Sequence, residues 1–401
     1  MSRIDDLHEH LARLNRIGIA LSSERDLRGL LRRILEEARL FTGAEAGTLY
    51  TVEGRTLRFV VSQNEVLPGR GGSDDSSVWF EDRRLPLSPD SMAGYVGLTG
   101  EVINLEDAYH IPAGRSYRFN AEFDRSVGYR SRSMLLVPMQ EPGGRTMGVL
   151  QLINARGVDG GVVPFDPRFE ELVRSLASQA AVAIRNVRLT EELKRAYHET
   201  ILRLAVAVEF RDDDTAEHIR RMAEYAVLIA KELGRDAEEV DLLRYAAPMH
   251  DVGKVGVPDA ILCKPGRLTA DEFDQMKRHT LIGAQILGDS EAPVLRVSAQ
   301  IARSHHEKFD GTGYPDGLSG QQIPLMGRIT ALADVFDALS SERCYKPAFP
   351  MDRCLAIVRE QRGRQFDPEV VDAFLRRTGE VGGIRAGRAS GLPGLGSVMT
   401  V

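Results

Sequence analysis

The sequence predicts a multidomain protein in which an α+β domain is joined by a long helix to an all-α domain. Two observations predict this class. Short β-like runs are concentrated between about residues 46 and 154, and apolar residues at three- and four-residue steps dominate from about residue 168 onwards. The 401 residues suit two or three domains, and 43% hydrophobic with 27% charged residues is typical of soluble globular proteins.

The first 45 residues are predicted to be helical, and strands follow. One apolar face comes from residues at three- and four-residue steps, namely Leu27, Leu30, Leu31, Ile34, Leu35 and Ala38. Glycine and proline turns such as 141–144 then separate short runs typical of strands, at 47–51, 56–61, 133–138 and 147–153. A helix, a sheet and a further helix describe an α+β domain of the sensor type.

A long helical stretch is predicted from about residue 168. Its apolar residues step by three and four, first Leu172, Leu176, Ala180, Ala183 and Val187, then Leu193, Tyr197, Ile201 and Leu204. This spacing fits a helix pair or short coiled coil, formed across a homodimer. The alternative is a single helix that lies on its own domain.

After residue 200 the chain is predicted to be nearly all helix. Thr269 and Glu272 form a T-x-x-E capping box, so a helix starts there and carries His279 on its second or third turn. The last residues, from Val381, are rich in Gly, Ala and Ser and lack periodicity, which predicts a disordered tail.

Composition excludes several classes of protein. The net charge of −6 argues against broad nucleic-acid binding, and no apolar run approaches the about 18–20 residues that cross a bilayer. Acids near the N-terminus are unlike a signal peptide, so a cytoplasmic location is expected. The three cysteines have no C-x-x-C spacing, which indicates neither a disulfide framework nor a thiolate zinc site.

Five histidines follow residue 200, and most lie near a carboxylate or another histidine: His218, His250, His279, His305 and His306. Asp214 and His218 are four residues apart and share one helix face. His250 and Asp251 are adjacent, and Lys254 follows within one turn. Asp334 and Asp337 stand one turn apart on a predicted helix.

Mixed imidazole and carboxylate ligands suit iron, manganese or zinc better than calcium or magnesium. The number of candidates exceeds the six ligands of one octahedral ion, which implies at least two ions that share a bridging carboxylate. A two-metal site can clamp the attacking and leaving oxygens of a phosphoester displacement.

Residues from about 199 to 375 resemble the HD-GYP family of phosphohydrolases. The run 250–259 resembles its HD segment, and 305–315 resembles its GYP segment. Further segments match in the family's order, at 211–218, 276–279, 333–338, 343–346 and 366–368. The resemblance implies an all-helical phosphodiesterase that opens cyclic di-GMP to pGpG, or onward to GMP, with two or three divalent ions, most often iron or manganese.

The resemblance also implies a role for individual residues. The metal ligands would be His218, His250, Asp251, His279, His305, His306 and Asp334. Asp251 would bridge two ions, and Lys254 would contact phosphate or assist the leaving group. Arg343 and Lys346 would hold substrate phosphate, Tyr314 would line the guanine or phosphate region, and Asp212 and Asp337 would orient the ligands.

The roles of Asp214 and of the 311–313 turn each have an alternative interpretation. Trinuclear relatives carry Glu where this chain has Asp214, so Asp214 is a candidate ligand for a third ion; otherwise it is an acid favoured at a helix N-terminus. The glycines of 311–313 would allow a sharp turn. In the family this loop also figures in contacts with diguanylate cyclases.

Residues 24–190 resemble a GAF domain, whose fold is an antiparallel sheet flanked by helices. The segments 104–109, 118–120 and 123–133 are similar to the centre of nucleotide-binding GAF domains, and Asn154 and Phe165 match part of their signature. Ala155 stands where that signature has lysine. The domain would therefore bind an unidentified small molecule or serve only for dimerisation.

The predicted organisation has five parts: an N-terminal helix at 1–23, a GAF sensor at 24–167, a linker helix at 168–198, an HD-GYP phosphodiesterase domain at 199–380 and a tail at 381–401. The predicted function is metal-dependent hydrolysis of cyclic di-GMP under control of the GAF domain. The alternatives are a phosphodiesterase for another cyclic dinucleotide and a non-catalytic cyclic di-GMP receptor or adaptor.

Overall fold

The computed structural model describes residues 26–66, 83–211, 216–342 and 347–387. The chain divides into two compact units between Glu192 and Leu193, and each has its own hydrophobic core. Among the described residues, no helix combines the length and the apolar character that crossing a lipid bilayer requires.

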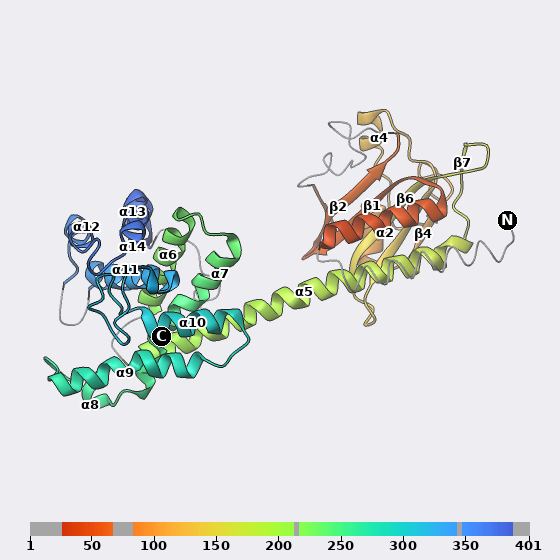
Figure 1. Ribbon diagram of the computed structural model, residues 1–401. Helices are drawn as coiled ribbons and strands as arrows, with labels where there is room; N and C mark the ends of the chain where they lie inside the picture. The colour runs from red at the N-terminus through yellow and green to blue at the C-terminus, as the bar shows by residue number, and fades with distance from the viewer. Residues whose placement is uncertain (1–25, 67–82, 212–215, 343–346, 388–401) are drawn as a thin grey trace. The chain divides into compact units, whose positions relative to one another are not determined.

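An antiparallel sheet of seven strands forms the centre of the first unit (Figure 1). Its order is β3-β2-β1-β6-β5-β4, and β7 pairs with β6. The strands are β1 (Ala44–Glu53), β2 (Thr56–Asn64), β3 (Arg84–Pro86), β4 (Ile103–Leu105), β5 (Met134–Gln140), β6 (Thr146–Arg156) and β7 (Val162–Val163). The strand runs predicted from the sequence lie on β1, β2, β5 and β6, so these predictions are confirmed.

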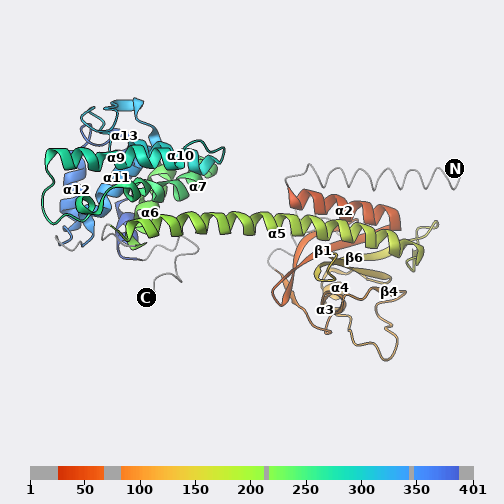
Figure 2. The same ribbon diagram turned by 90° about the horizontal axis from the view of Figure 1, so that it is seen from below.

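Helices cover both faces of this sheet. α2 (Leu27–Thr42) and the first part of α5 (Arg168–Glu209) run side by side on one face (Figures 1 and 2). α3 (Met92–Thr99) packs on the other face, and α4 (Glu122–Val127) follows β4 along the chain. The predicted apolar face of α2 is buried from Leu30 to Ala38, because it is the side that meets the sheet.

The second unit is helical throughout its described residues apart from turns and one isolated β-bridge, as predicted. After the end of α5 its helices are α6 (Ala216–Glu232), α7 (Ala237–Ala246), η2 (Ala247–Met249), η3 (Val252–Gly256), α8 (Asp259–Leu262), α9 (Ala270–Leu287), α10 (Pro293–Ser304), η4 (Gly320–Gln322), α11 (Leu325–Ser340), α12 (Met351–Glu360), α13 (Pro368–Arg376) and α14 (Thr378–Arg385). The capping box of Thr269 and Glu272 is present at the start of α9, and His279 lies on its third turn.

Three buried aromatic side chains pack helices α6, α11 and α13 of the second unit against one another. Tyr225 of α6, Phe336 of α11 and Phe374 of α13 are fully buried, and their ring centroids lie 4.7 to 6.4 Å apart. Their edge-to-face contacts are a favourable geometry for buried aromatic rings. The cluster therefore fixes α6 against α11, which carry His218 and Asp334.

Two predicted boundaries differ from the structure: the end of the linker helix and the start of the C-terminal tail. α5 continues past residue 198 to Glu209. The tail predicted from Val381 is wrong for its first residues, since α14 runs to Arg385 and buries Val381 and Ile384. These two side chains are three residues apart, which is enough for one turn of helix to pack although the segment is rich in glycine. The helix predicted at 1–23 and the tail from 388 lie outside the described residues.

Candidate metal centre

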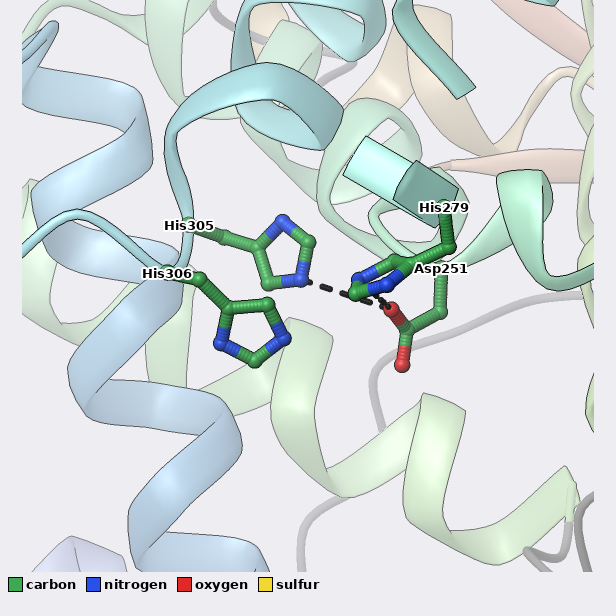
Figure 3. A group of neighbouring side chains, drawn as sticks. All are labelled: Asp251, His279, His305 and His306. Carbon is green, nitrogen blue, oxygen red and sulfur yellow. Dashed lines mark ion pairs between the residues drawn. The ribbon is translucent and has the colours of Figure 1, made fainter. Parts of the chain in front are cut away.

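Seven potential metal ligands lie on or directly beside six helical elements of the second unit. His218 lies on α6, His250 follows η2, Asp251 precedes η3 and His279 lies on α9; the others are His305 and His306 after α10 and Asp334 on α11. Figure 3 shows His305 and His306 reaching from one segment of chain towards Asp251 and His279. The seven ligands span 116 residues of the sequence, from His218 to Asp334, and only the packing of the helices brings them together.

These side chains form groups in which the potential ligand atoms lie within 4.8 Å of one another. One group is Asp251, His279, His305 and His306; a second is His218, His250 and Asp334; a third is Glu209, His250 and Asp251. Because the groups share Asp251 and His250, they form one continuous centre with room for more than one ion.

Asp251 directs one oxygen to each side of this centre. Its Oδ1 lies 3.2 Å from Nε2 of His279 and 3.3 Å from Nε2 of His305. Its Oδ2 lies 3.3 Å from Nε2 of His250 and 2.7 Å from Nζ of Lys254. A carboxylate with its two oxygens placed in this way has the geometry of a bridging ligand.

The imidazoles are oriented through Nδ1. In His250, His279 and His305 this nitrogen lies 2.6 to 3.1 Å from a backbone carbonyl, of Ala247, Met276 and both Ile301 and Ala302 respectively. A carbonyl oxygen only accepts hydrogen bonds, so Nδ1 carries the proton. The lone pair is then on Nε2 and points into the centre, which is the arrangement a metal requires.

Several buried polar atoms of the centre have no hydrogen-bond partner among the described residues. They are Glu209 Oε2, His250 Nε2, Asp251 Oδ1, His279 Nε2 and His305 Nε2. Buried polar atoms in folded proteins are almost always satisfied, and an ion is one explanation for a cluster of exceptions. The donor set is nitrogen and carboxylate oxygen, which fits first-row transition metals.

The charge balance of the centre also favours a cation. Burial alone would raise the pKa of Asp251, but Lys254 and His250 hold it well below its usual range, so the carboxylate is ionised. Burial opposes protonation of His250, yet the carboxylates of Asp251, Asp334 and Glu209 raise its pKa to about 9, so an ion that binds there has to displace a proton from Nε2. Burial lowers the pKa of His305 and, together with His305, that of His306, which keeps these rings neutral as ligands must be.

Asp337 lies behind His218. Its Oδ2 is 2.8 Å from Nδ1 of His218, and its two oxygens accept hydrogen bonds of 2.7 and 2.9 Å from Arg221. Burial alone would raise the pKa of Asp337, but His218 and Arg221 lower it. The position is that of a residue that sets the ring orientation of a metal ligand.

Two glycines allow η3 to lie directly on α9. A Cβ on Gly253 would be 1.8 Å from the carbonyl oxygen of His279 and 2.4 Å from the nitrogen of Gly283. Only glycine permits this approach, which brings Asp251 of one element to His279 of the other.

The described part of the chain brings all but four of the predicted site residues together. Tyr314 lies against His306, with ring centroids 4.8 Å apart and the rings tilted by 32°. Asp212, Asp214, Arg343 and Lys346 lie outside the described residues, and their predicted roles are not tested.

The remaining predicted residue, Lys254, lies within the centre, and a further acid near it was missed. Glu209 Oε2 lies 3.6 Å from Nζ of Lys254. Glu209 is 2% exposed, and it continues the three- to four-residue apolar steps of Leu202 and Ala205. An acid in an apolar position of a helix was the available signal. Arg221, the partner of Asp337, carried no such signal.

Comparison with known proteins identifies both units. Residues 26–184 match the GAF domain model, and residues 184–370 match an HD domain model. The chain thus combines a GAF domain with a helical HD domain. The segments 250–259 and 305–315, which resemble the HD-GYP family, lie within the matched HD domain.

Three of these relatives are named as phosphodiesterases. The chain is 52% identical over 185 residues to "Cyclic di-GMP phosphodiesterase response regulator RpfG" of Xanthomonas campestris, covering 46% of this chain and 49% of that protein. It is 40% identical over 236 residues to "3'3'-cGAMP-specific phosphodiesterase 2" of Vibrio cholerae, covering 58% and 45%. It is 47% identical over 197 residues to a "Cyclic di-GMP phosphodiesterase" of Vibrio cholerae, covering 46% and 40%. Each match thus spans less than half of the relative's length.

Proposed function

We propose that the second unit hydrolyses a phosphodiester bond of cyclic di-GMP to give linear pGpG, or onward GMP. The observation that carries this proposal is the buried set of Nε2 and carboxylate atoms arranged on both sides of Asp251. Relatives named as cyclic di-GMP phosphodiesterases support the choice of substrate.

Two divalent ions, iron or manganese, fit this set. One would be held by Asp251, His279, His305 and His306, and the other by His218, His250, Asp251 and Asp334. Glu209 is a candidate ligand for a third ion, as is Asp214 from the sequence. When bound, the ions would lower the pKa of water and neutralise charge that develops on the phosphate.

The chain's own residues would supply proton transfer and orientation. Water attacks phosphorus, the P–O3′ bond breaks, and the leaving oxygen needs a proton. Lys254 is an ammonium 2.7 Å from Asp251 and therefore beside the place of reaction, and it would donate this proton. Arg343 and Lys346 would hold the phosphate oxygens, as the family resemblance implies.

A second candidate substrate is 3'3'-cGAMP. The observation in its favour is the 40% identity to a phosphodiesterase named as specific for this molecule, over more of this chain than the other two matches cover. Both molecules contain two phosphodiesters and at least one guanine, so the same centre would act on either.

The test is anaerobic purification with metal analysis, followed by incubation with cyclic di-GMP or 3'3'-cGAMP and chromatography of the products. Two or more ions per chain and the appearance of linear dinucleotide are expected. Asp251→Asn should remove both, whereas Asp241→Asn, an exposed acid on α7, should change neither. A metal-loaded protein that leaves both molecules intact would overturn the proposal in favour of a receptor or adaptor.

Regulation by the GAF domain is proposed on two observations. The first unit contains a cavity of about 720 Å³, whose wall includes Thr48, Tyr50, Ser62 and Gln151 and which is large enough for a small molecule. Helix α5 begins against the sheet of this unit, and its last residue, Glu209, belongs to a group of the metal centre. A ligand that alters α5 would therefore act on Glu209.

Two protein contacts complete the proposal. Leu193, Tyr197 and Leu204 are exposed on one face of α5 and would be covered by a second copy of the chain, in a homodimer. Sedimentation of the Leu193→Glu variant tests this: monomers are expected, and an unchanged mass would contradict it. The 311–313 turn would contact diguanylate cyclases, as the family resemblance implies.

A further inference from the structure

An exposed aromatic ring and a partly buried lysine lie beside the metal centre, on the side of His306. Phe273 on α9 is 44% exposed, which is unusual for so large an apolar side chain. Lys277 lies one turn further along the same helix. Neither residue has a part in the chemistry described above.

Tyr314 connects this pair to the metal centre. Its ring lies 4.8 Å from that of His306 at an interplanar angle of 32°, and 6.1 Å from that of Phe273 at 79°. Phe273 is thus separated from a proposed metal ligand by a single aromatic ring. If a phosphate binds at the metal centre, the nucleoside attached to it would lie about one aromatic ring away, beside Tyr314 and Phe273.

The segment that carries Tyr314 is held firmly in place. Glu307, the residue after His306, is buried, and its carboxylate accepts hydrogen bonds of 2.7 to 3.1 Å from the backbone nitrogens of Asp316, Gly317 and Leu318. The backbone nitrogen of Tyr314 donates to the carbonyl of His306. The backbone that carries Tyr314 is therefore held in place, and its ring lies between those of His306 and Phe273.

Lys277 is positioned over these rings. Its Nζ lies 4.8 Å from the ring centroid of Phe273 and 5.8 Å from that of Tyr314. The carboxylate of Asp274, 2.7 Å away, fixes it there. An ammonium over aromatic rings is attracted by their π electrons. An ammonium has three N–H donors, and the described residues provide one acceptor, Asp274, so Lys277 has further donors for a ligand.

An exposed aromatic ring with an ammonium donor close to its face is suited to a nucleobase. Bases stack on exposed aromatic side chains because every base has a π face. The donor then selects among bases: guanine presents two acceptors, O6 and N7, to a lysine, whereas adenine presents an amino group where guanine has O6. The combination therefore favours guanine.

We propose that Phe273 and Lys277 form a guanine site for the cyclic dinucleotide, in which the base packs against Phe273 and Lys277 donates to O6 and N7. This inference rests on the proposed function. The site determines which nucleotide lies next to the reacting phosphate. It follows that 3'3'-cGAMP, which has one guanine, binds in one orientation and is opened at one of its two phosphodiesters.

The first test compares Phe273→Ala with a matched control on the same helix. Leu281→Ala removes an equally exposed apolar side chain, 41% exposed, and should leave all rates unchanged. Phe273→Ala should lower kcat/KM for cyclic di-GMP at least tenfold more than for bis(p-nitrophenyl) phosphate, which has no base, and the loss should be in KM. Phe273→Trp should restore KM, because it restores a stacking surface.

The second test concerns the choice of base. Lys277→Met keeps the apolar stem and removes the donors, so the preference for cyclic di-GMP over cyclic di-AMP should fall about tenfold. Wild-type protein should give a single linear product from 3'3'-cGAMP, and Lys277→Met a mixture. Equal loss towards base-containing and base-free substrates, or an unchanged preference, would overturn the proposal.

Direct binding separates this inference from the proposed function. Calorimetric titration with cyclic di-GMP should show weaker binding to Phe273→Ala than to wild type or Leu281→Ala. A wild-type protein that hydrolyses bis(p-nitrophenyl) phosphate and binds but does not cleave cyclic di-GMP would overturn the proposed function while the binding comparison still decides the guanine site. Equal binding by all three proteins would overturn the guanine site alone.

Discussion

Replacing Asp337 with alanine should weaken metal binding and destabilise the second unit by separable amounts. Asp337 is 1% exposed and accepts hydrogen bonds from His218 and Arg221. Its removal leaves the guanidinium of Arg221 largely buried without its carboxylate, which costs about 3–5 kcal/mol when one partner of a buried ion pair is lost. At about 2–4 °C per kcal/mol for a unit of this size, the melting temperature should fall by about 6–20 °C.

The metal affinity should fall as well, because the ring of His218 loses the group that sets its orientation. Loss of such a partner typically costs about 10–100-fold in metal affinity. Arg221→Met is the matched control: it breaks the same ion pair but leaves Asp337 on His218. Thermal denaturation and metal titration of both variants are the assays. If Asp337→Ala binds metal as tightly as Arg221→Met does, Asp337 acts only through stability and the reasoning is refuted.

Three further changes test the centre from other directions. Asp251→Ala removes the shared carboxylate, so metal content and activity should vanish together, and full activity would exclude the site assignment. Gly253→Ala would place a Cβ 1.8 Å from the carbonyl oxygen of His279; overpacking of this kind costs about 1–3 kcal/mol, measured by thermal denaturation, and an unchanged melting temperature would contradict the close approach of η3 to α9. Arg343→Ala should mainly raise KM for cyclic di-GMP in steady-state assays, and an unchanged KM would remove its phosphate role.

The metal centre could be predicted largely from sequence because its residues occur in short motifs. His250 and Asp251 are adjacent, as are His305 and His306, so each pair carries its own signal. The fold class was equally accessible, since the periodicity changes clearly near residue 168. Only packing, however, shows that Asp251 turns one oxygen to each side of the centre.

The parts that could not be predicted depend on contacts between distant residues. Glu209 lies 41 residues before His250, and nothing between them ties the two together. Arg221 is one of many arginines until α11 brings Asp337 to it. Likewise, α14 forms in a glycine-rich segment because burial of Val381 and Ile384 outweighs a weak local preference for helix.

The hydrogen bonds from the imidazoles also complete the ends of helices. Ala247 directly follows α7, and Ile301 and Ala302 lie in the last turn of α10; the carbonyls of Ala247 and Ile301 also accept the backbone N–H groups of His250 and His305. His250 and His305 donate to these carbonyls, so each ring is at once a proposed metal ligand and a further contact at a helix C-terminus. Substituting either histidine therefore removes a side-chain hydrogen bond at a helix end as well as a proposed ligand. Variants at the carboxylates, which cap nothing at these two helix ends, separate metal binding from folding more cleanly.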